Sequence, residues 1–126
     1  MAEASAERIT EAEYAVMEVL WAKAPQSATE VADALEAGRG WGLPTVKTLL
    51  SRLVAKRALA AEAEGRRFHY RPLIAREGYL GHESRRLIDR LFGGRAAPLF
   101  AHLAEAEALS DDDLAEIEAL LKRLRA

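Results

Sequence analysis

Basic and hydroxyl-bearing residues in the middle of the sequence are the ones whose types and spacing could do chemistry. A helix is predicted from Pro44 to Arg57, because apolar residues recur there at i, i+3, i+4, i+7 and i+8. Those apolar residues are Val46, Leu49, Leu50, Leu53 and Val54. The rest of the helix surface carries small, hydroxyl-bearing or basic residues, namely Pro44, Thr45, Lys47, Thr48, Ser51 and Arg52, with Lys56 near its end.

This set of side chains is suited to the major groove of DNA. Small residues let the helix approach the base edges, hydroxyls can bond to bases or phosphates, and lysine or arginine can reach guanine or the backbone. No acidic residue occurs from Thr45 to Arg57, whereas a helix that only faces solvent commonly pairs Glu with Lys at i, i+4. The alternative is a plain amphipathic helix.

The net charge of −2 hides an uneven distribution along the chain. The segment from Gly38 to Arg76 holds nine basic and two acidic residues, a net charge of +7, and the rest of the chain carries −9. A slightly acidic protein can therefore still bind a polyanion, because binding depends on where positive charge is clustered and not on the net charge. The alternative is an ordinary solvated face.

A β-hairpin is predicted after this helix. Small or apolar residues alternate before a turn at Glu64–Gly65, and Phe68 and Tyr70 alternate with basic residues after it. We expect the basic side to act as a wing that grips phosphate or enters a minor groove. The two aromatic rings are expected to face the core, and stacking on single-stranded bases is the alternative. The wing residues expected to contact DNA are Arg66, Arg67 and His69.

Two shorter helices are predicted to position the one that begins at Pro44. Thr10 with Glu13, and Ser27 with Glu30, have the spacing of capping boxes. Gly38 is expected to end the second of these helices. Three helices followed by a hairpin are typical of a winged helix-turn-helix.

Three more helices are predicted after Leu73. The first runs to Phe92 before Gly93–Gly94, the second begins near Pro98, and the third has Ser110 as its N-cap. Their apolar stripes are long relative to the core that one chain could close, so we expect a symmetric dimer; packing back on the N-terminal part is the alternative. The residues assigned to dimerisation are Leu80, Leu87, Ile88, Leu91, Leu99, Phe100, Leu103, Leu114, Ile117 and Leu121.

The composition argues against several other classes of protein. The chain has no cysteine, which excludes disulfides, thiolate metal sites and cysteine nucleophiles. Its histidines, His69, His82 and His102, lie on three different predicted elements without ligand spacing, so we expect no metal, no cofactor and no enzyme. No apolar run reaches the roughly 20 residues of a membrane span, and the N-terminus has no hydrophobic signal core. A cytoplasmic protein without membrane insertion is expected.

Four segments resemble the penicillinase repressor (BlaI/MecI) family, and together they cover nearly the whole chain. They are TEAEYAVMEVLW, WGLPTVKTLLSRLVAKRAL, GRRFHYRPLIAREGY and RLIDRLFGGRAAPLFAHLAEAEALSDDDLAEIEALL. The resemblance implies a cytoplasmic homodimeric repressor whose helix with Thr45, Lys47, Thr48, Ser51 and Arg52 enters the major groove of double-stranded operator DNA. It also implies a membrane-bound sensor with a metalloprotease domain, which relieves repression by cleaving the dimerisation domain.

The chain departs from the family pattern in three ways. The cleaved bond of the family lies between Asn and Phe, and the matching position here is His102–Leu103, so cleavage at this bond would need a different specificity. Copper-responsive members have C-terminal cysteines, which this chain lacks. Gly42 stands where the family typically has a serine N-cap, which weakens the start of the helix by a few tenths of a kcal/mol.

These patterns together predict a mainly α fold with a small β-hairpin wing. Residues 1–75 are expected to form a winged helix-turn-helix DNA-binding domain, and residues 76–126 a helical dimerisation domain. The predicted function is sequence-specific repression by a homodimer on a pseudo-palindromic operator, with β-lactam or cell-wall response genes as targets. The alternative is a winged-helix protein-interaction module, against which the acid-free helix face and the basic wing argue.

Overall fold

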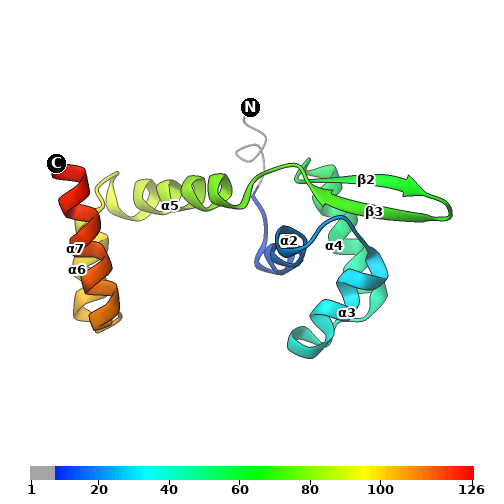
Figure 1. Ribbon diagram of the computed structural model, residues 1–126, viewed down its shortest axis with the longest axis horizontal. Coiled ribbons are helices and arrows are strands. Elements are labelled where there is room, and N and C mark those ends of the chain that lie inside the picture. The colour runs from blue at the N-terminus through cyan, green and yellow to red at the C-terminus, as the bar shows by residue number, and fades with distance from the viewer. Residues whose placement is uncertain (1–7) are drawn as a thin grey trace. The chain divides into compact units, whose positions relative to one another are not determined.

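The computed structural model describes residues 8–126, which form a mainly helical fold with one small sheet (Figure 1). This confirms the predicted fold class. The chain divides into two compact units, Met1–His82 and Glu83–Ala126. The division falls inside a helix rather than at the predicted boundary after residue 75, and residues 1–7 of the first predicted domain lie outside the described residues. The assignment of DNA binding and dimerisation to the two domains stays a prediction.

The first two helices begin with capping boxes, as predicted. At the start of α2 (Glu11–Ala22), the Thr10 hydroxyl accepts from the Glu13 N–H and the Glu13 carboxylate accepts from the Thr10 N–H. The same exchange joins Ser27 and Glu30 at the start of α3 (Ala28–Arg39). Each box satisfies two backbone donors that a helix start leaves free.

The end of α3 differs from the prediction. Gly38 lies within the helix, and Gly40 is the C-cap, with a left-handed φ of +67°. Both glycines could end a helix by composition, but only the one that adopts positive φ does so.

Helix α4 (Leu43–Ala55) has the predicted apolar stripe buried. Val46, Leu50 and Leu53 are fully buried, and Leu49 is nearly so. The helix ends before the predicted Arg57: Lys56 is its C-cap, and Arg57 has a left-handed φ of +65°.

The predicted hairpin is present and carries an additional strand. Strands β2 (Leu59–Glu64) and β3 (Arg67–Pro72) pair antiparallel, and their turn is centred on Gly65–Arg66, one residue later than predicted, with Gly65 at φ +64°. The short strand β1 (Gln26–Ser27) pairs antiparallel with β3, giving the order β1-β3-β2. Two residues are too few to show an alternating pattern, so β1 is not predictable from the sequence.

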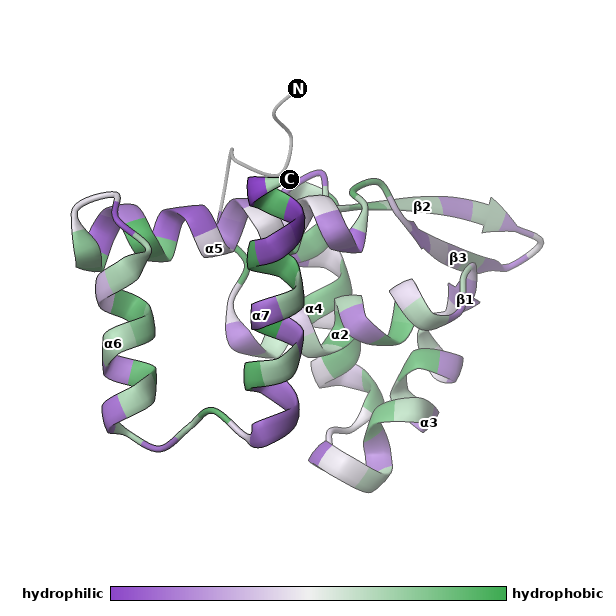
Figure 2. Ribbon diagram, turned by 60° about the vertical axis from the view of Figure 1, so that its left-hand side comes forward, coloured by the Kyte–Doolittle hydropathy of each residue, from purple (hydrophilic) through white to green (hydrophobic). Residues whose placement is uncertain are grey.

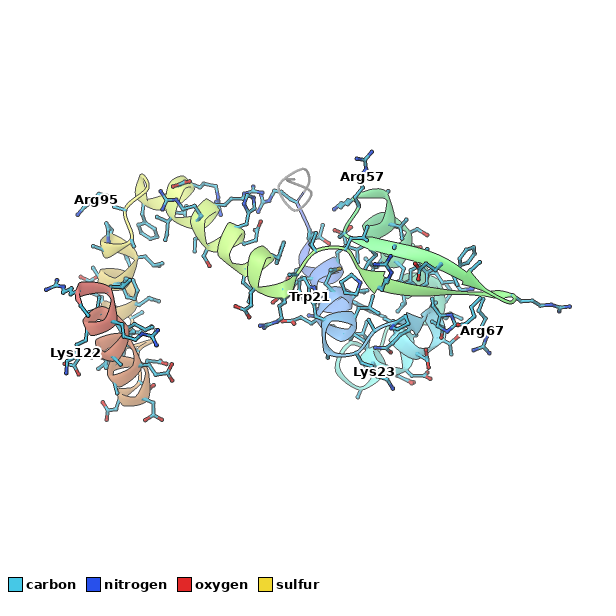
Figure 3. All side chains as sticks on the ribbon, turned by 45° about the horizontal axis from the view of Figure 1, so that its top comes forward. Trp21, Lys23, Arg57, Arg67, Arg95 and Lys122 are labelled. Atoms are coloured by element: carbon cyan, nitrogen blue, oxygen red, sulfur yellow. The ribbon has the colours of Figure 1, made fainter. Side chains whose placement is uncertain are left out.

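An aromatic cluster joins α2 to the start of α5 (Arg76–Phe92). The rings of Tyr14, Trp21 and Tyr79 have centroids 5.7–5.9 Å apart, and Trp21 is labelled in Figure 3. Beside them, the Arg76 guanidinium donates to both carboxylate oxygens of Glu18, at 2.9 and 3.2 Å. Hydrogen bonds from Arg76 hold the pKa of Glu18 below its usual value.

The second unit contains α6 (Ala97–Glu105) and α7 (Asp111–Arg125) after the end of α5. Ser110 caps α7 in a third capping box, with Asp113. The starts near Pro98 and Ser110 agree with the prediction. Neither helix has a buried residue, and Figure 2 shows hydrophobic residues along both.

Candidate nucleic-acid interface

The predicted recognition face of α4 is exposed along its length. Thr48 Oγ1 donates to the Pro44 carbonyl at 3.1 Å, so its oxygen remains an acceptor for another group. The positively charged side chains of this face come from Lys47 and Arg52. The exposed residues are Pro44, Thr45, Lys47, Thr48, Ser51 and Arg52.

Lys56 has a different position from the one expected of a DNA contact. Its Nζ lies 2.6 Å from the Glu13 Oε1 and 2.6 Å from the Arg8 carbonyl oxygen. Glu13 is only 1% exposed. Burial raises the pKa of Glu13, but hydrogen bonds from Lys56 and the Thr10 N–H outweigh this and leave the pKa below its usual value. The Lys56 ammonium is therefore already paired within the fold, by the Glu13 carboxylate and the Arg8 carbonyl.

The basic residues between Gly38 and Arg76 divide into two groups. Four have partners: Lys56 binds Glu13, Arg71 binds Glu62, Arg76 binds Glu18, and Arg39 lies over the Trp41 ring. The others have no carboxylate partner among residues 8–126. These unpaired residues are Lys47, Arg52, Arg57, Arg66 and Arg67.

Four of these unpaired side chains occur on α4 and around the turn of the wing. Figure 3 shows Arg57 at the α4 end of the hairpin and Arg67 toward its tip. Arg66 lies in the turn itself and Arg67 begins β3. Positive charge that no carboxylate of residues 8–126 neutralises is thus available at the recognition face and at the wing tip, where phosphates could neutralise it.

The outer face of the wing is less cationic than predicted. Arg71 pairs with Glu62 at 3.2 Å, and the His69 Nδ1 lies 3.0 Å from a Glu64 carboxylate oxygen. That nitrogen is buried and makes no hydrogen bond within the described residues. His69 thus faces an acidic neighbour on its own hairpin, which does not favour the expected DNA contact.

Phe68 does not lie in the core, and the prediction for it is wrong. Its side chain is 55% exposed, whereas Tyr70 is half-buried and packs against the core. Phe68 pairs across the hairpin with Ala63, and Tyr70 with Ala61. Such small partners cannot cover a ring, and the hairpin extends beyond the helices of its unit (Figure 1).

Two grooves flank these aromatic rings. One, of about 180 Å³, lies between the wing tip, the first turn of α3 and Lys47 of α4. The other, of about 200 Å³, lies beside Ser51 and Val54 of α4. Phe68 and Tyr70 line both grooves, and among residues 8–126 no acidic side chain lines either.

The candidate dimerisation residues are mostly exposed or half-buried in this single chain. Leu91, Phe100, Leu114 and Leu121 are between 43 and 55% exposed. Leu80 differs, because it packs against the core of the first unit. Half-buried positions in the second unit are Leu87, Ile88, Leu99, Leu103 and Ile117.

The predicted cleavage position lies inside a helix. His102 and Leu103 belong to α6, and the His102 ring centroid lies 5.7 Å from that of Phe92. Across residues 8–126, no three His, Cys, Asp or Glu side chains are grouped so that they could hold a metal ion. Within the same range, no helix has the length and apolar character needed to cross a membrane.

Comparison with known proteins gives one consistent result. The family model described as penicillinase repressor matches residues 9–123. The penicillinase repressor of Bacillus licheniformis is 30% identical over 115 residues, which cover 91% of this chain and 90% of that protein.

Solved structures are similar as well. The solution structure of the DNA-binding domain of the repressor BlaI has a TM-score of 0.52 and 38% identity, over 57% of this chain and 88% of that one. Monomeric Bacillus licheniformis BlaI in complex with the blaP half-operator has a TM-score of 0.51 and 37% identity, over 58% and 89%.

Proposed function

The chain belongs to the penicillinase repressor family, and from that premise we propose that it represses transcription by binding double-stranded operator DNA through α4 and the wing. The family consists of DNA-binding repressors rather than enzymes, in agreement with the sequence prediction. Its relative BlaI has been solved on a half-operator. In this proposal α4 enters the major groove of the operator, because its exposed face carries small, hydroxyl-bearing and basic residues.

The observation that carries this proposal is the distribution of unpaired positive charge. Lys47 and Arg52 flank an exposed, acid-free helix face, and Arg66 and Arg67 lie at the wing tip. A protein-interaction module would have no need to leave these four side chains without carboxylate partners in the described part of the chain. Phosphates and guanine acceptors are suitable partners for the pair on α4 and for the pair at the wing tip. One DNA duplex can contact both places.

The test removes the charges of the recognition helix. Lys47→Ala and Arg52→Ala should each lower the affinity for an operator duplex at least about tenfold, because each loses a base or phosphate contact. The operator is first selected from genomic DNA with the purified protein. Fluorescence anisotropy at fixed salt then measures the affinity, and Arg95→Ala, which removes an exposed charge from the second unit, is the control.

Two results would contradict the proposal that the exposed face of α4 contacts DNA. One is unchanged affinity in both α4 variants while the wild-type protein binds tightly. The other is an equal loss with Arg95→Ala, which would indicate a general charge effect. A wild-type protein that selects no duplex at all would remove the proposed function itself.

We further propose that the repressor is a homodimer on a pseudo-palindromic operator and that it acts in the cytoplasm. The exposed apolar residues of α5, α6 and α7 support the dimer, because a monomer would leave them in water. Genes of a β-lactam or cell-wall response are the proposed targets, by analogy with the family. Selection of genomic fragments identifies them directly.

Induction by a membrane-bound sensor metalloprotease is proposed as the release mechanism. The expected bond, His102–Leu103, lies in α6, so this helix has to unwind before a protease can bind it in extended form. Co-expression with a sensor protease encoded beside the gene, followed by mass spectrometry of the fragments, tests the position. An intact chain in induced cells would contradict proteolytic release.

A further inference from the structure

Phe68 is an exposed aromatic side chain for which the fold gives no structural reason. It is 55% exposed, whereas Tyr70, two residues along the same strand face, packs against the core. A large apolar side chain so far out of the core adds little to stability. Exposed aromatic residues are characteristic of binding surfaces.

The surroundings of Phe68 point to one kind of occupant. The groove on one side of the ring is also lined by Lys47, Arg66 and Arg67, which have no carboxylate partner among residues 8–126. The second groove that Phe68 lines is also lined by Ser51 of the recognition face. An apolar ring between cations matches a polymer whose anionic groups alternate with apolar rings, as phosphates alternate with deoxyriboses in DNA.

The small residues nearby leave space for such a polymer. Ala63 faces Phe68 across the hairpin, and Ala28 of α3 lines the same groove. Larger side chains at these positions would cover the ring. The groove therefore stays open between the wing and α4.

We propose that Phe68 is a DNA-contacting residue that packs against the deoxyriboses of one strand where it passes between α4 and the wing. Lys47 binds a phosphate on one side of this sugar contact, and the arginines at the wing tip bind phosphates on the other. The inference rests on the proposed function and deepens it. It assigns an apolar, sequence-independent contact to a wing whose expected contacts are ionic.

The experiment compares Phe68→Ala and Phe68→Leu in the full-length protein. Phe68→Ala should weaken binding to the selected operator and to a mixed-sequence duplex by a similar factor, roughly tenfold, because buried apolar area is lost. Phe68→Leu should retain most of the affinity. Leu73→Ala is the matched control, since Leu73 is a 47% exposed apolar residue that lines neither groove.

The salt dependence of binding separates this contact from an ionic one. Phe68→Ala should leave the slope of log affinity against log salt unchanged, because no counterion release is lost. The double variant Arg66→Ala with Arg67→Ala should make that slope shallower. Thermal unfolding of each variant verifies that the fold is kept.

The possible outcomes are distinct. If the wild type binds duplex DNA and Phe68→Ala binds equally well, this inference fails and the proposed function stands. A loss confined to the operator would overturn the sugar contact in favour of base readout. Tighter binding of wild type to single-stranded than to duplex DNA, lost in Phe68→Ala, would overturn it in favour of base stacking. No duplex binding by the wild type would remove both proposals.

Discussion

A basic side chain of this chain helps to hold the fold when it has a partner within the fold, and Lys56 has the most buried partner. Lys56 contacts a carboxylate that is 1% exposed, while its own side chain is 18% exposed. An isolated carboxylate at that depth would be costly, so the ion pair is required once Glu13 is buried. Because Lys56 caps α4 and Glu13 belongs to the capping box of α2, one contact fixes the recognition helix relative to the first helix.

Replacing Lys56 should therefore lower stability more than DNA affinity. Lys56→Met leaves Glu13 buried without its cation, and the free energy of unfolding should fall by about 2–3 kcal/mol, below the range for fully buried pairs since Lys56 is partly exposed. Urea unfolding at fixed protein concentration measures this. The double variant with Glu13→Gln should recover part of the loss, and additive losses would contradict the pairing.

The same pair predicts a pH dependence. The folded pKa of Glu13 lies below its usual value of 4.5, so the carboxylate stabilises the fold fully above about pH 4.5, and this contribution is lost as the pH falls through the folded pKa. Lys56→Met removes a hydrogen bond and a positive charge that both lower the pKa of Glu13, so this pKa should rise and acid should cost the variant less stability than the wild type. A larger acid loss in the variant would contradict this explanation.

The chemistry of these residues is predictable from the sequence, whereas their partners are not. The acid-free face of α4 was identified because its helical period is visible in the sequence. Lys56 was assigned to DNA because its partner Glu13 is 43 residues away, and no local pattern shows such a contact. The prediction for Phe68 is wrong for another reason. Alternation tells which side of a strand a residue is on, but it does not tell how far the strand extends beyond the helices that could cover it.

At the scale of the elements, helix starts were predictable and other details were not. All three capping boxes have hydroxyl and carboxylate three residues apart, a signal confined to four residues. The choice between Gly38 and Gly40 as the end of α3 depends on φ, which composition does not show. Strand β1 forms only because β3 is beside it.

The helix proposed to read DNA begins without a side-chain cap. Gly42 is the N-cap of α4 and offers no side-chain acceptor to the first turn. Its φ of −80° and ψ of 170° suit any residue, and an added Cβ would meet only the Pro44 Cδ, at 3.6 Å. A serine is therefore accommodated at this position without strain.

Gly42→Ser should stabilise the protein by a few tenths of a kcal/mol, because its hydroxyl accepts a free N–H of α4. The corresponding rise in melting temperature is about 1 °C, measurable by differential scanning calorimetry. Gly42→Ala is the control, since it adds the Cβ without the acceptor and should not stabilise. A rise of the same size with alanine would show that chain entropy, not capping, is responsible.

At the scale of the whole molecule, the second unit has an incomplete core. One side of α7 carries Leu114, Ile117, Leu120, Leu121 and Leu124, and four of these are between 47 and 81% exposed. The other side carries small or charged residues such as Ala115 and Ala119. An amphipathic helix whose apolar side remains in water is suited to cover the same surface of a second copy.

Leu121→Asp in the full-length protein should therefore convert the proposed dimer to a monomer, because a charge would be buried between the two copies. Light scattering should give a mass near 13.9 kDa for the variant and near twice that for the wild type. Ala119→Asp puts the same charge on the opposite side of α7 and should remain dimeric. The fold of the first unit, with its own buried core, should be retained in both variants.

Loss of the dimer in Leu121→Asp should also weaken binding to the operator, on which repression depends. A dimer engages two half-sites, and the second contact is then intramolecular, so the monomer should bind a full operator much more weakly. On a single half-site, Leu121→Asp and wild type should bind alike, because α4 and the wing are untouched. A Leu121→Asp protein that remains dimeric, or that binds the full operator as tightly as Ala119→Asp does, would show that this side of α7 is not the dimer interface.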